Sequence, residues 1–448
     1  FMTQKLQSLA QALIDAAKTA GAQQADAIVV DGRSIDISLR KGALEQAQRS
    51  EEIELGLRVL IDGRHACVSV SDISERTIAD VAERAVAMAK EAPIDPYAGL
   101  ADPSELIRTW DLAALEIYDN SAEPQADVLQ EGARRAEAAA LAAGDITQVE
   151  ASAGYSTNHV YLAASNGFSG GYGRSTRYIS AVAFTGAGNK MERDWSGEAR
   201  IYQSDVPDAE QVGAQAAARA LARSGARKPK TGFYPVLFDE RIASSLIGHL
   251  LSAVNGAMIS RGSSWLLQDL GRQILPKGMD VVEDPLRRRT SGSRPFDAEG
   301  LATKKRFIVQ DGVLLGWTLD LANARKLGMQ STASATRSTS SAPQPSTSNI
   351  DLSVGNLAQD DLLTQMGTGL LVTSMIGSTI NPNTGDYSRG ASGFWVENGE
   401  ITYAVNECTV AGNLRDMLGK MVAGNDTRAH LSTRVPSLLI DGLTLAGA

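Results

Sequence analysis

Cysteine and histidine are scarce in this chain. Its 448 residues include two cysteines, Cys67 and Cys408, and four histidines. The cysteines lie too far apart for a Cys-x-x-Cys metal or redox motif, and two of them make no disulfide framework. We therefore expect both to be buried thiols.

Long apolar runs and an excess of positive charge are also missing. No run approaches the length of a membrane span, and the first residues lead into an amphipathic helix without a signal-peptide core. Lysine and arginine number 43 against 52 acidic residues, a formal charge of −9. Such a chain has no global field for nucleic acid or an anionic membrane. We expect a soluble, cytoplasmic protein.

The length predicts two or three domains. A polar stretch at 227–232, containing proline and glycine, is the best boundary. We therefore predict an N-terminal domain at 1–229 and a C-terminal domain at 230–448.

The first part alternates apolar and polar residues between amphipathic helices. Alternation at 27–30, 35–39 and 53–61 predicts strands, with hairpin turns at Asp31-Gly32, Lys41-Gly42 and Asp62-Gly63. Further strands are expected at 148–155 and 160–164. We predict a mixed or antiparallel sheet flanked by helices.

The second part is richer in strands. Hairpins are predicted around Asp311-Gly312 and Asn398-Gly399, and a closing strand at 438–445. The expected fold class is α+β, with a curved, barrel-like antiparallel sheet in the C-terminal domain.

A polar segment at 331–349 interrupts this pattern. It holds eleven serines or threonines and two prolines among nineteen residues. Disorder is the simplest interpretation of such a composition. Long loops in compact domains are often active-site lids, so that alternative stays open.

The chain is organised around one strand and helix. The apolar run 234–238 predicts a buried strand, and Asp239 stands where a helix N-cap is expected. The helix predicted at 239–254 carries His249 on its apolar side.

A family resemblance rests on two later motifs. NPNTGDYSRGASGFWVENGEI at 381–401 and NECTVAGNL at 406–414 resemble the C-terminal hallmark of the TldD/PmbA peptidases, also called modulators of DNA gyrase. The second motif is especially similar to the PmbA (TldE) branch. The resemblance covers most of the second half, and the first half agrees in the order of its elements.

The resemblance implies a degenerate zinc site. The TldD branch carries His-Glu-x-x-x-His on this helix, and here Ser244, Ser245 and His249 occupy those three positions. Zinc hydrolysis needs about three protein ligands, an open water position and a carboxylate base. The TldD branch adds a cysteine near its C-terminus, but 427–435 contains none.

The family therefore implies a metal-free subunit, whose TldD-like partner binds zinc. Together the two would cleave unfolded peptides, in peptide-antibiotic maturation and antitoxin degradation. Asp386, Tyr387 and Ser388 are candidates for lining the substrate cleft. We expect no cofactor in this chain, and a homodimer of the isolated chain stays open.

Two other functions remain open. The chain could be a stand-alone metallopeptidase that combines His249 with unusual ligands such as Asp239, Glu240 or Cys408. It could also be a homo-oligomeric, non-enzymatic modulator of DNA gyrase. His65 and His159 have no ligand-like spacing, and His430 is expected in an exposed loop.

Overall fold

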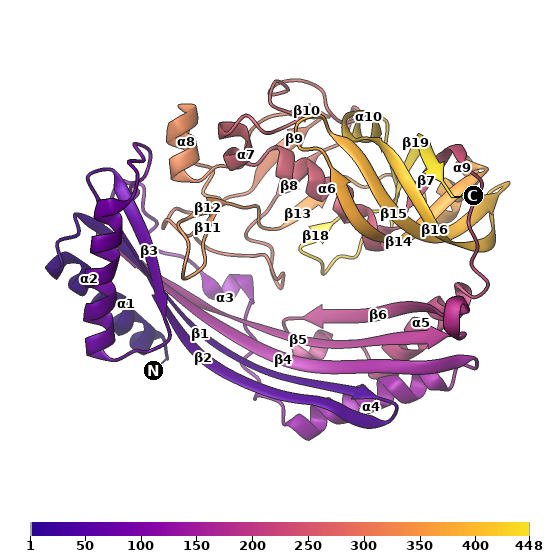
Figure 1. Ribbon diagram of the computed structural model, residues 1–448, viewed down its shortest axis with the longest axis horizontal. Helices are drawn as coiled ribbons and strands as arrows, with labels where there is room; N and C mark the ends of the chain where they lie inside the picture. Colours follow the sequence, from indigo (N-terminus) through magenta and orange to yellow (C-terminus); the bar gives the residue numbers. More distant parts are fainter. Residues whose placement is uncertain (1, 448) are drawn as a thin grey trace.

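The computed structural model describes residues 2–447. The first half forms one antiparallel sheet in the order β3-β2-β1-β4-β5-β6. Figure 1 shows this sheet as a long layer beneath the second half of the chain. Its strands are β1 (Gln24–Arg40), β2 (Ala43–Ile61), β3 (Arg64–Val70), β4 (Ile146–Ala164), β5 (Ser169–Thr185) and β6 (Glu192–Arg200).

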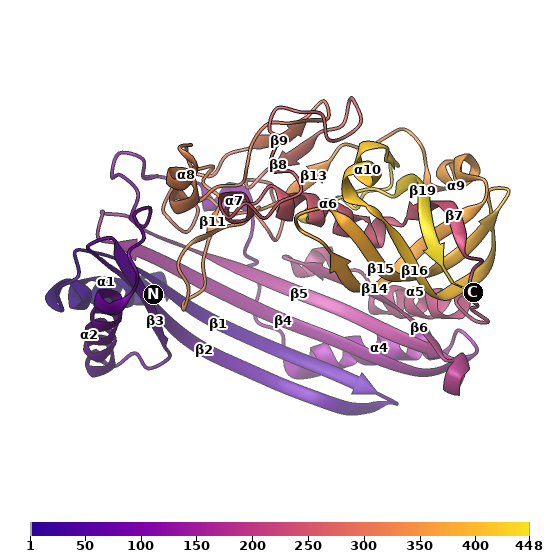
Figure 2. The same cartoon turned by 45° about the horizontal axis from the view of Figure 1, so that its top comes forward.

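Four helices cover one face of this sheet. Alternate residues of β1 point to that face: Ala27 and Val29 pack against one helix pair, Ile35 and Ile37 against the other. The helices are α1 (Met2–Thr19) and α2 (Glu75–Glu91) at one end, and α4 (Ala126–Leu141) and α5 (Ala209–Ala222) at the other. The opposite face is turned toward the second half (Figure 2).

Two strands are longer than the sequence predicts. Asp31-Gly32 is not a turn, because β1 runs through it and pairs Asp31 with both Ile53 and His159. Strand β4 likewise continues through the predicted break at 156–159. Pairing on both sides satisfies every backbone group there, which overrides the local turn preference. The predicted turns at 41–42 and 62–63 are confirmed.

A closed barrel forms much of the second half. Its strands follow the order β16-β15-β14-β7-β19, and β16 also pairs with β19. They are β7 (Gly232–Phe238), β14 (Gly369–Ile380), β15 (Asp386–Glu397), β16 (Glu400–Asn413) and β19 (Leu438–Ala446). The predicted α+β fold with a barrel-like sheet is confirmed, although β7 and β14 run parallel. Closure leaves these strands no open edge.

The remaining elements are short and surround the barrel. A small sheet has the order β10-β9-β8-β13-β18. It consists of β8 (Val281–Glu283), β9 (Arg306–Gln310), β10 (Val313–Leu314), β13 (Ile350–Leu352) and β18 (Thr433–Arg434). The other elements are α3 (Leu112–Leu115), α6 (Glu240–Ala253), α7 (Gly256–Ser260), α8 (Leu321–Leu327), β11 (Ala335–Thr336), β12 (Gln344–Pro345), α9 (Gln359–Met366), α10 (Leu414–Gly419) and β17 (Val422–Ala423).

Helix α6 packs into the main core of the barrel half. Leu246, Ile247 and Leu250 are fully buried there, together with Val236 and Phe238 of β7. Burial of one such side chain contributes about 1.5–3 kcal/mol. Packing on this scale fixes both the position and the rotation of α6.

The segment 331–349 is ordered, so the disorder interpretation is wrong. Strands β11 and β12 pair within it, and Ala335 and Asn349 are fully buried. A side chain at Gly56 of β2 would collide with the backbone of Thr339, since its Cβ would lie 2.2 Å from the carbonyl oxygen. The segment therefore lies directly on the first sheet.

Three buried charges join this segment to the sheet. Asp26 of β1 accepts hydrogen bonds from Arg58 of β2 and from Arg337. The side chains are at most 9% exposed. Although burial opposes ionisation, the two guanidinium groups lower the pKa of Asp26 below its usual value. This ionic triad connects residues that are 311 positions apart in the chain.

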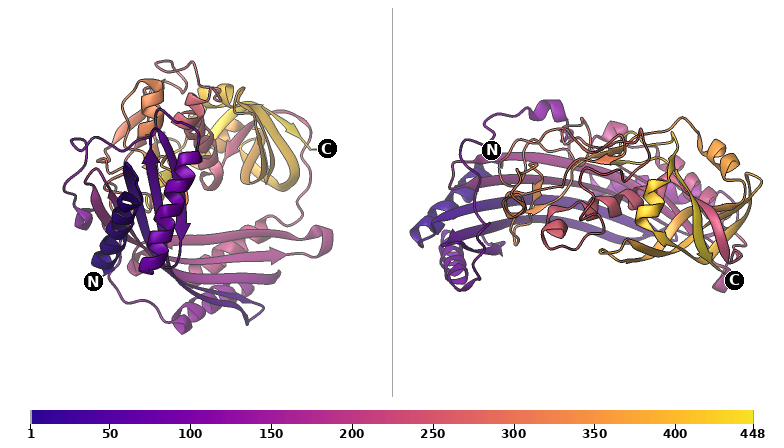
Figure 3. Two further views of the ribbon diagram at one scale, coloured as in Figure 1. Left: turned by 60° about the vertical axis from the view of Figure 1, so that its left-hand side comes forward. Right: turned by 90° about the horizontal axis from the view of Figure 1, so that it is seen from above.

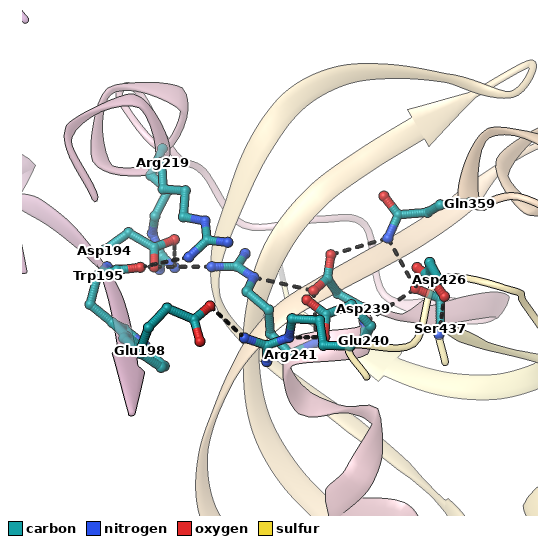
Figure 4. A network of polar contacts seen from close by, with 12 residues as sticks. Asp194, Trp195, Glu198, Arg219, Asp239, Glu240, Arg241, Gln359, Asp426 and Ser437 are labelled. Atoms are coloured by element: carbon teal, nitrogen blue, oxygen red, sulfur yellow. Dashed lines mark hydrogen bonds and ion pairs between the residues drawn. The ribbon is translucent and has the colours of Figure 1, made fainter. Parts of the chain in front are cut away.

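A second set of charges joins β6 to the start of α6 (Figure 4). Asp194 lies 3.3 Å from Arg241 and 3.7 Å from Arg223. Arg241 also contacts Asp239, at 3.2 Å. These four side chains are no more than 14% exposed. Buried charges are costly unless they are paired. These ion pairs therefore favour one placement of the barrel on the first sheet, and Figure 3 shows the two as separate layers.

The network continues through Glu198 of β6. Arg428 lies 2.8 Å from Glu240 and 3.6 Å from Glu198. Glu198 also lies 2.8 Å from Nε2 of His430. Burial opposes ionisation here as well, but His430 and Arg200 lower the pKa of Glu198 to about 2. His430 lies in a turn, as predicted, but it is half-buried rather than exposed.

The two cysteines differ in burial. Cys408 is buried as predicted, whereas Cys67 is only half-buried, so that prediction is wrong for Cys67.

Among residues 2–447, no helix combines the length and apolarity needed to cross a bilayer.

Replacing Asp26 by asparagine is expected to lower the free energy of unfolding by about 3–5 kcal/mol, because two buried guanidinium groups lose their shared counter-charge. Urea denaturation measures this loss. Asp80→Asn is the matched control, since that carboxylate is 69% exposed on α2 and should not affect the midpoint. Equal midpoints for D26N and the wild type would contradict a stabilising role for the triad.

Glu198 predicts a pH dependence of stability. Its lowered pKa means that the carboxylate stabilises the fold above the ordinary value of 4.5, and that this contribution is lost as the pH falls toward 2. E198Q should therefore lose less stability than the wild type between pH 5 and pH 3, as measured by urea midpoints. Glu83→Gln, on the exposed side of α2, serves as control. Parallel curves for E198Q and the wild type would exclude this effect.

Candidate functional site

Helix α6 begins at a well-defined cap. The carboxylate of Asp239 accepts the backbone N–H of Arg241 at 3.0 Å, and the N–H of Glu240 donates to Ser437 at 3.1 Å. A negative charge here also complements the helix dipole. The helix predicted at 239–254 is confirmed, and its three motif positions can be located.

Ser244 and Ser245 face one hollow. It has a volume of about 320 Å³ and is also lined by Arg241, Met375 and Arg389. The hydroxyl of Ser245 donates to the carbonyl of Ile242 at 2.7 Å. The hydroxyl is therefore used within the helix itself, as is common for a serine in a helix interior.

His249 faces a different hollow, of about 240 Å³. Its other walls include Met258, Trp265, Ile380 and Pro382. Positions five apart on an ideal helix differ by roughly 140° in direction, which accounts for the separation from Ser244. The structure does not bring the three motif positions together around one point.

The imidazole of His249 is half-buried and poorly partnered. Its Nε2 atom is buried and has no hydrogen-bond partner among residues 2–447. Burial, and then the charge of Arg389, lower the pKa of His249. The ring contacts Tyr387 edge-on, with ring centres 5.8 Å apart. These surroundings favour the neutral form of the His249 imidazole.

The alternative ligands lie elsewhere. Asp239 and Glu240 stand ten and nine residues before His249, about 14–15 Å along the helix axis. Asp239 contacts Arg241 and Gln359, and Glu240 contacts Arg428. None of these carboxylates is positioned to share a metal ion with His249.

Cys408 is equally unsuited to that ligand set. Its thiol donates to the carbonyl of Ala391 at 3.2 Å, and burial raises its pKa to about 11. A metal ligand must be the thiolate, which this environment disfavours. In the described part of the chain, no group of three or more His, Cys, Asp or Glu side chains could hold a metal ion.

The hallmark segment places its candidates in different environments. Asp386, at the start of β15, is exposed and accepts hydrogen bonds from Thr384 at 2.7 Å and Asn413 at 3.1 Å. Those bonds lower the pKa of Asp386. Tyr387 is 2% exposed, and burial raises its pKa. Ser388 is half-buried.

These positions link the two family motifs. The contact between Tyr387 and His249 brings the hallmark strand against the motif helix. Asp386 instead closes the turn that precedes β15. Lining of a substrate cleft by Asp386, Tyr387 and Ser388 stays a prediction.

The remaining histidines are dispersed. His159 lies 5.1 Å from the ring of Tyr118. His65 lines a hollow of about 490 Å³, together with Arg58, Glu299 and Asp320. Sequence reasoning missed this polar hollow, because its walls come from distant segments that share no local motif.

The family models cover most of the chain. The PmbA/TldA metallopeptidase domain 1 matches residues 25–89, the central domain matches 119–224, and the C-terminal domain matches 231–447. All three are parts of the same metallopeptidase family.

Individual relatives agree over nearly the full length. Metalloprotease PmbA of Escherichia coli O157:H7 is 37% identical over 429 residues, 94% of this chain and 92% of that protein. The PmbA homologue of Haemophilus influenzae is 36% identical over 451 residues, 99% of this chain and 96% of the other.

Solved structures share the fold. A Bacteroides thetaiotaomicron protein described as a modulator of DNA gyrase superposes with a TM-score of 0.92 at 29% identity, over 100% of both chains. TldE from Thermococcus kodakarensis has the same fold, with a TM-score of 0.85 at 19% identity over 98% of this chain and 100% of its own. Because the family models match most of the chain and PmbA relatives match nearly its full length, this chain belongs to the PmbA/TldD metallopeptidase family, in its PmbA (TldE) branch.

Proposed function

We propose that this chain is the metal-free subunit of a heteromeric zinc peptidase. A TldD-like partner supplies the zinc and the catalytic base, and this chain completes the binding site for unfolded peptides. By family resemblance, the substrates are peptides in antibiotic maturation and antitoxin degradation.

One observation carries this proposal. On α6, the positions that zinc hydrolysis would fill with an imidazole and a carboxylate hold the hydroxyls of Ser244 and Ser245. A serine hydroxyl is neutral at pH 7 and is neither a strong zinc ligand nor a general base. His249 is the sole imidazole on the helix, and its side chain lines another hollow. These residues do not fit a catalytic zinc ion.

The polar face of the first sheet supports a role in peptide binding. Opposite its helices, β1 and β4 carry small or polar residues in register, under the barrel half. They are Ser34, Asp36 and Ser38 on β1, and Ser156, Gly154 and Ser152 on β4. Hydroxyl and carboxylate groups can bond the backbone of an extended peptide without selecting its side chains.

The first test compares this chain alone, a TldD-like chain from the same source, and their mixture. Zinc content is measured by elemental analysis and cleavage by hydrolysis of an unfolded peptide. We expect bound zinc and chelator-sensitive cleavage in the mixture, and neither with this chain alone. Stoichiometric zinc on this chain alone, with cleavage, would instead indicate a stand-alone metallopeptidase.

His249→Ala gives a second test. Because the imidazole has no partner ligands here, the variant should leave the zinc content and the kcat/KM of the mixture unchanged. Replacing a histidine of the partner's zinc motif is the matched control and should abolish both. Loss of zinc in the H249A mixture would assign His249 a ligand role. Binding to DNA gyrase without any peptidase activity would favour the modulator function.

A further inference from the structure

The hollow beside Ser244 and Ser245 has positive charge on its walls and no negative charge. It measures about 320 Å³ and lies among α6, β14, β15 and β18. Two arginines line it, and no aspartate or glutamate of residues 2–447 does. This lining differs from that of the hollow beside His65, where Glu299 and Asp320 balance the cations.

The two arginines differ in their partners. Arg241 is neutralised, because it lies 3.3 Å from Asp194 and 3.2 Å from Asp239. Arg389 forms no ion pair with a carboxylate among residues 2–447, and its Nε donates to the carbonyl of Gly377 at 2.7 Å. A bond to a neutral carbonyl orients the guanidinium but leaves its charge uncompensated. The charge of Arg389 is therefore available to a ligand.

A ligand in the hollow can reach this guanidinium. Arg389 follows Tyr387 by two residues on β15, so both side chains leave the strand on the face that meets α6. Tyr387 is buried, whereas Arg389 is half-buried and borders the hollow. None of the Arg389 nitrogens is a buried donor without an acceptor. The side chain is thus at the surface of the hollow and not sealed in the core.

Hydroxyl and apolar groups complete the walls. Ser244 and Thr433 are half-buried, and their hydroxyls can donate to a carboxylate oxygen. Ile242, Leu251 and Met375 provide apolar surface. A guanidinium matches the planar, bidentate geometry of a carboxylate, and a single uncompensated cation suits a monoanion. Apolar surface beside the charge suits the methylene groups of a glutamate side chain.

We propose that this hollow binds the side-chain carboxylate of a glutamate in an unfolded peptide. Arg389 pairs with the carboxylate, the hydroxyls of Ser244 and Thr433 donate to it, and the glutamate methylenes pack on Leu251 and Met375. The first sheet contacts the peptide backbone without regard to sequence, so this hollow adds a preference for an acidic residue. This inference rests on the proposed peptide-binding function and specifies its substrate class.

The test uses two peptides that differ in one group. Both are decapeptides of alanine and serine with blocked ends, and the central residue is glutamate in one and glutamine in the other. Binding to the isolated full chain is measured by fluorescence anisotropy with a neutral label. We expect the glutamate peptide to bind at least roughly fivefold more tightly, with a preference that shrinks as salt is added. Equal affinities, or no binding of the glutamate peptide, would overturn the proposal.

Arg389→Gln tests the charge. The variant should lose most of the preference for the glutamate peptide and bind the glutamine peptide as the wild type does, since a neutral amide needs no counter-charge. Arg76→Gln is the matched control, because that arginine is 92% exposed on α2 and should affect neither peptide. An unchanged preference in R389Q would overturn the assignment.

Gly248→Leu tests the hollow without altering a charge. Gly248 lies on α6 at the wall, and a Cβ there would meet no atom within 4 Å, so a leucine side chain can fill the space. Replacing a helical glycine also favours the helix, so this variant should fold even where R389Q folds poorly. We expect G248L to lose the preference for the glutamate peptide. A full preference in G248L would overturn the assignment.

Two further probes separate the sources of the anion. The glutamine peptide with a free C-terminal carboxylate should bind much less tightly than the glutamate peptide, and inorganic phosphate should compete poorly. Equal affinity of that free end, or equal competition by phosphate, would overturn the assignment to a glutamate side chain.

The binding test is independent of the partner chain. Failure of the glutamate preference leaves the zinc and activity results of the mixture intact. Failure of the mixture to cleave peptide, with the glutamate preference retained, would refute the proposed function alone.

Discussion

The buried triad of Asp26, Arg58 and Arg337 determines how the middle of the chain lies on the first sheet. The one carboxylate and two guanidinium groups together carry a net positive charge. In the low-dielectric interior, separating either guanidinium from the Asp26 carboxylate is costly. Arg337 must therefore lie beside Asp26 of β1 when the chain is folded. The segment 331–349 follows that requirement, and its residue Thr339 lies directly on Gly56 of the sheet.

Helix α6 is held in place by contacts that do not involve Ser244 or Ser245. Its N-cap is formed by Asp239, its apolar face is buried, and the contact between His249 and Tyr387 joins the two family motifs. The charges around Arg241 still place the start of this helix against β6. The apolar packing and the ion pairs of α6 are made by residues other than Ser244 and Ser245. These two serines can therefore differ from the zinc motif without disturbing the fold.

Local patterns predicted the elements better than their extent. Asp239 as N-cap, the helix after it and the glycine turns at 41–42 and 62–63 follow from short-range chemistry, and the structure confirms them. Asp31-Gly32 failed as a turn because pairing on both sides of β1 decides its conformation. The order of 331–349 was also missed, since the burial of Ala335 and Asn349 depends on partners distant in sequence. The serines at two positions of the zinc motif can be read from the sequence. That Ser244 and His249 face two different hollows is seen only in the fold.

Closure of the barrel has a consequence for folding kinetics. Phe238 of β7 pairs with Leu438 of β19, about 200 residues later, and β19 also pairs with β16 to close the ring. Contacts between such distant segments cost loop entropy before they return any stability, and they slow folding. During synthesis, β7 can pair with β14 first, but its second neighbour, β19, is made only at the end of the chain. The first sheet needs no residue beyond Arg200 to complete its pairing, so it can form while the barrel still has an open edge.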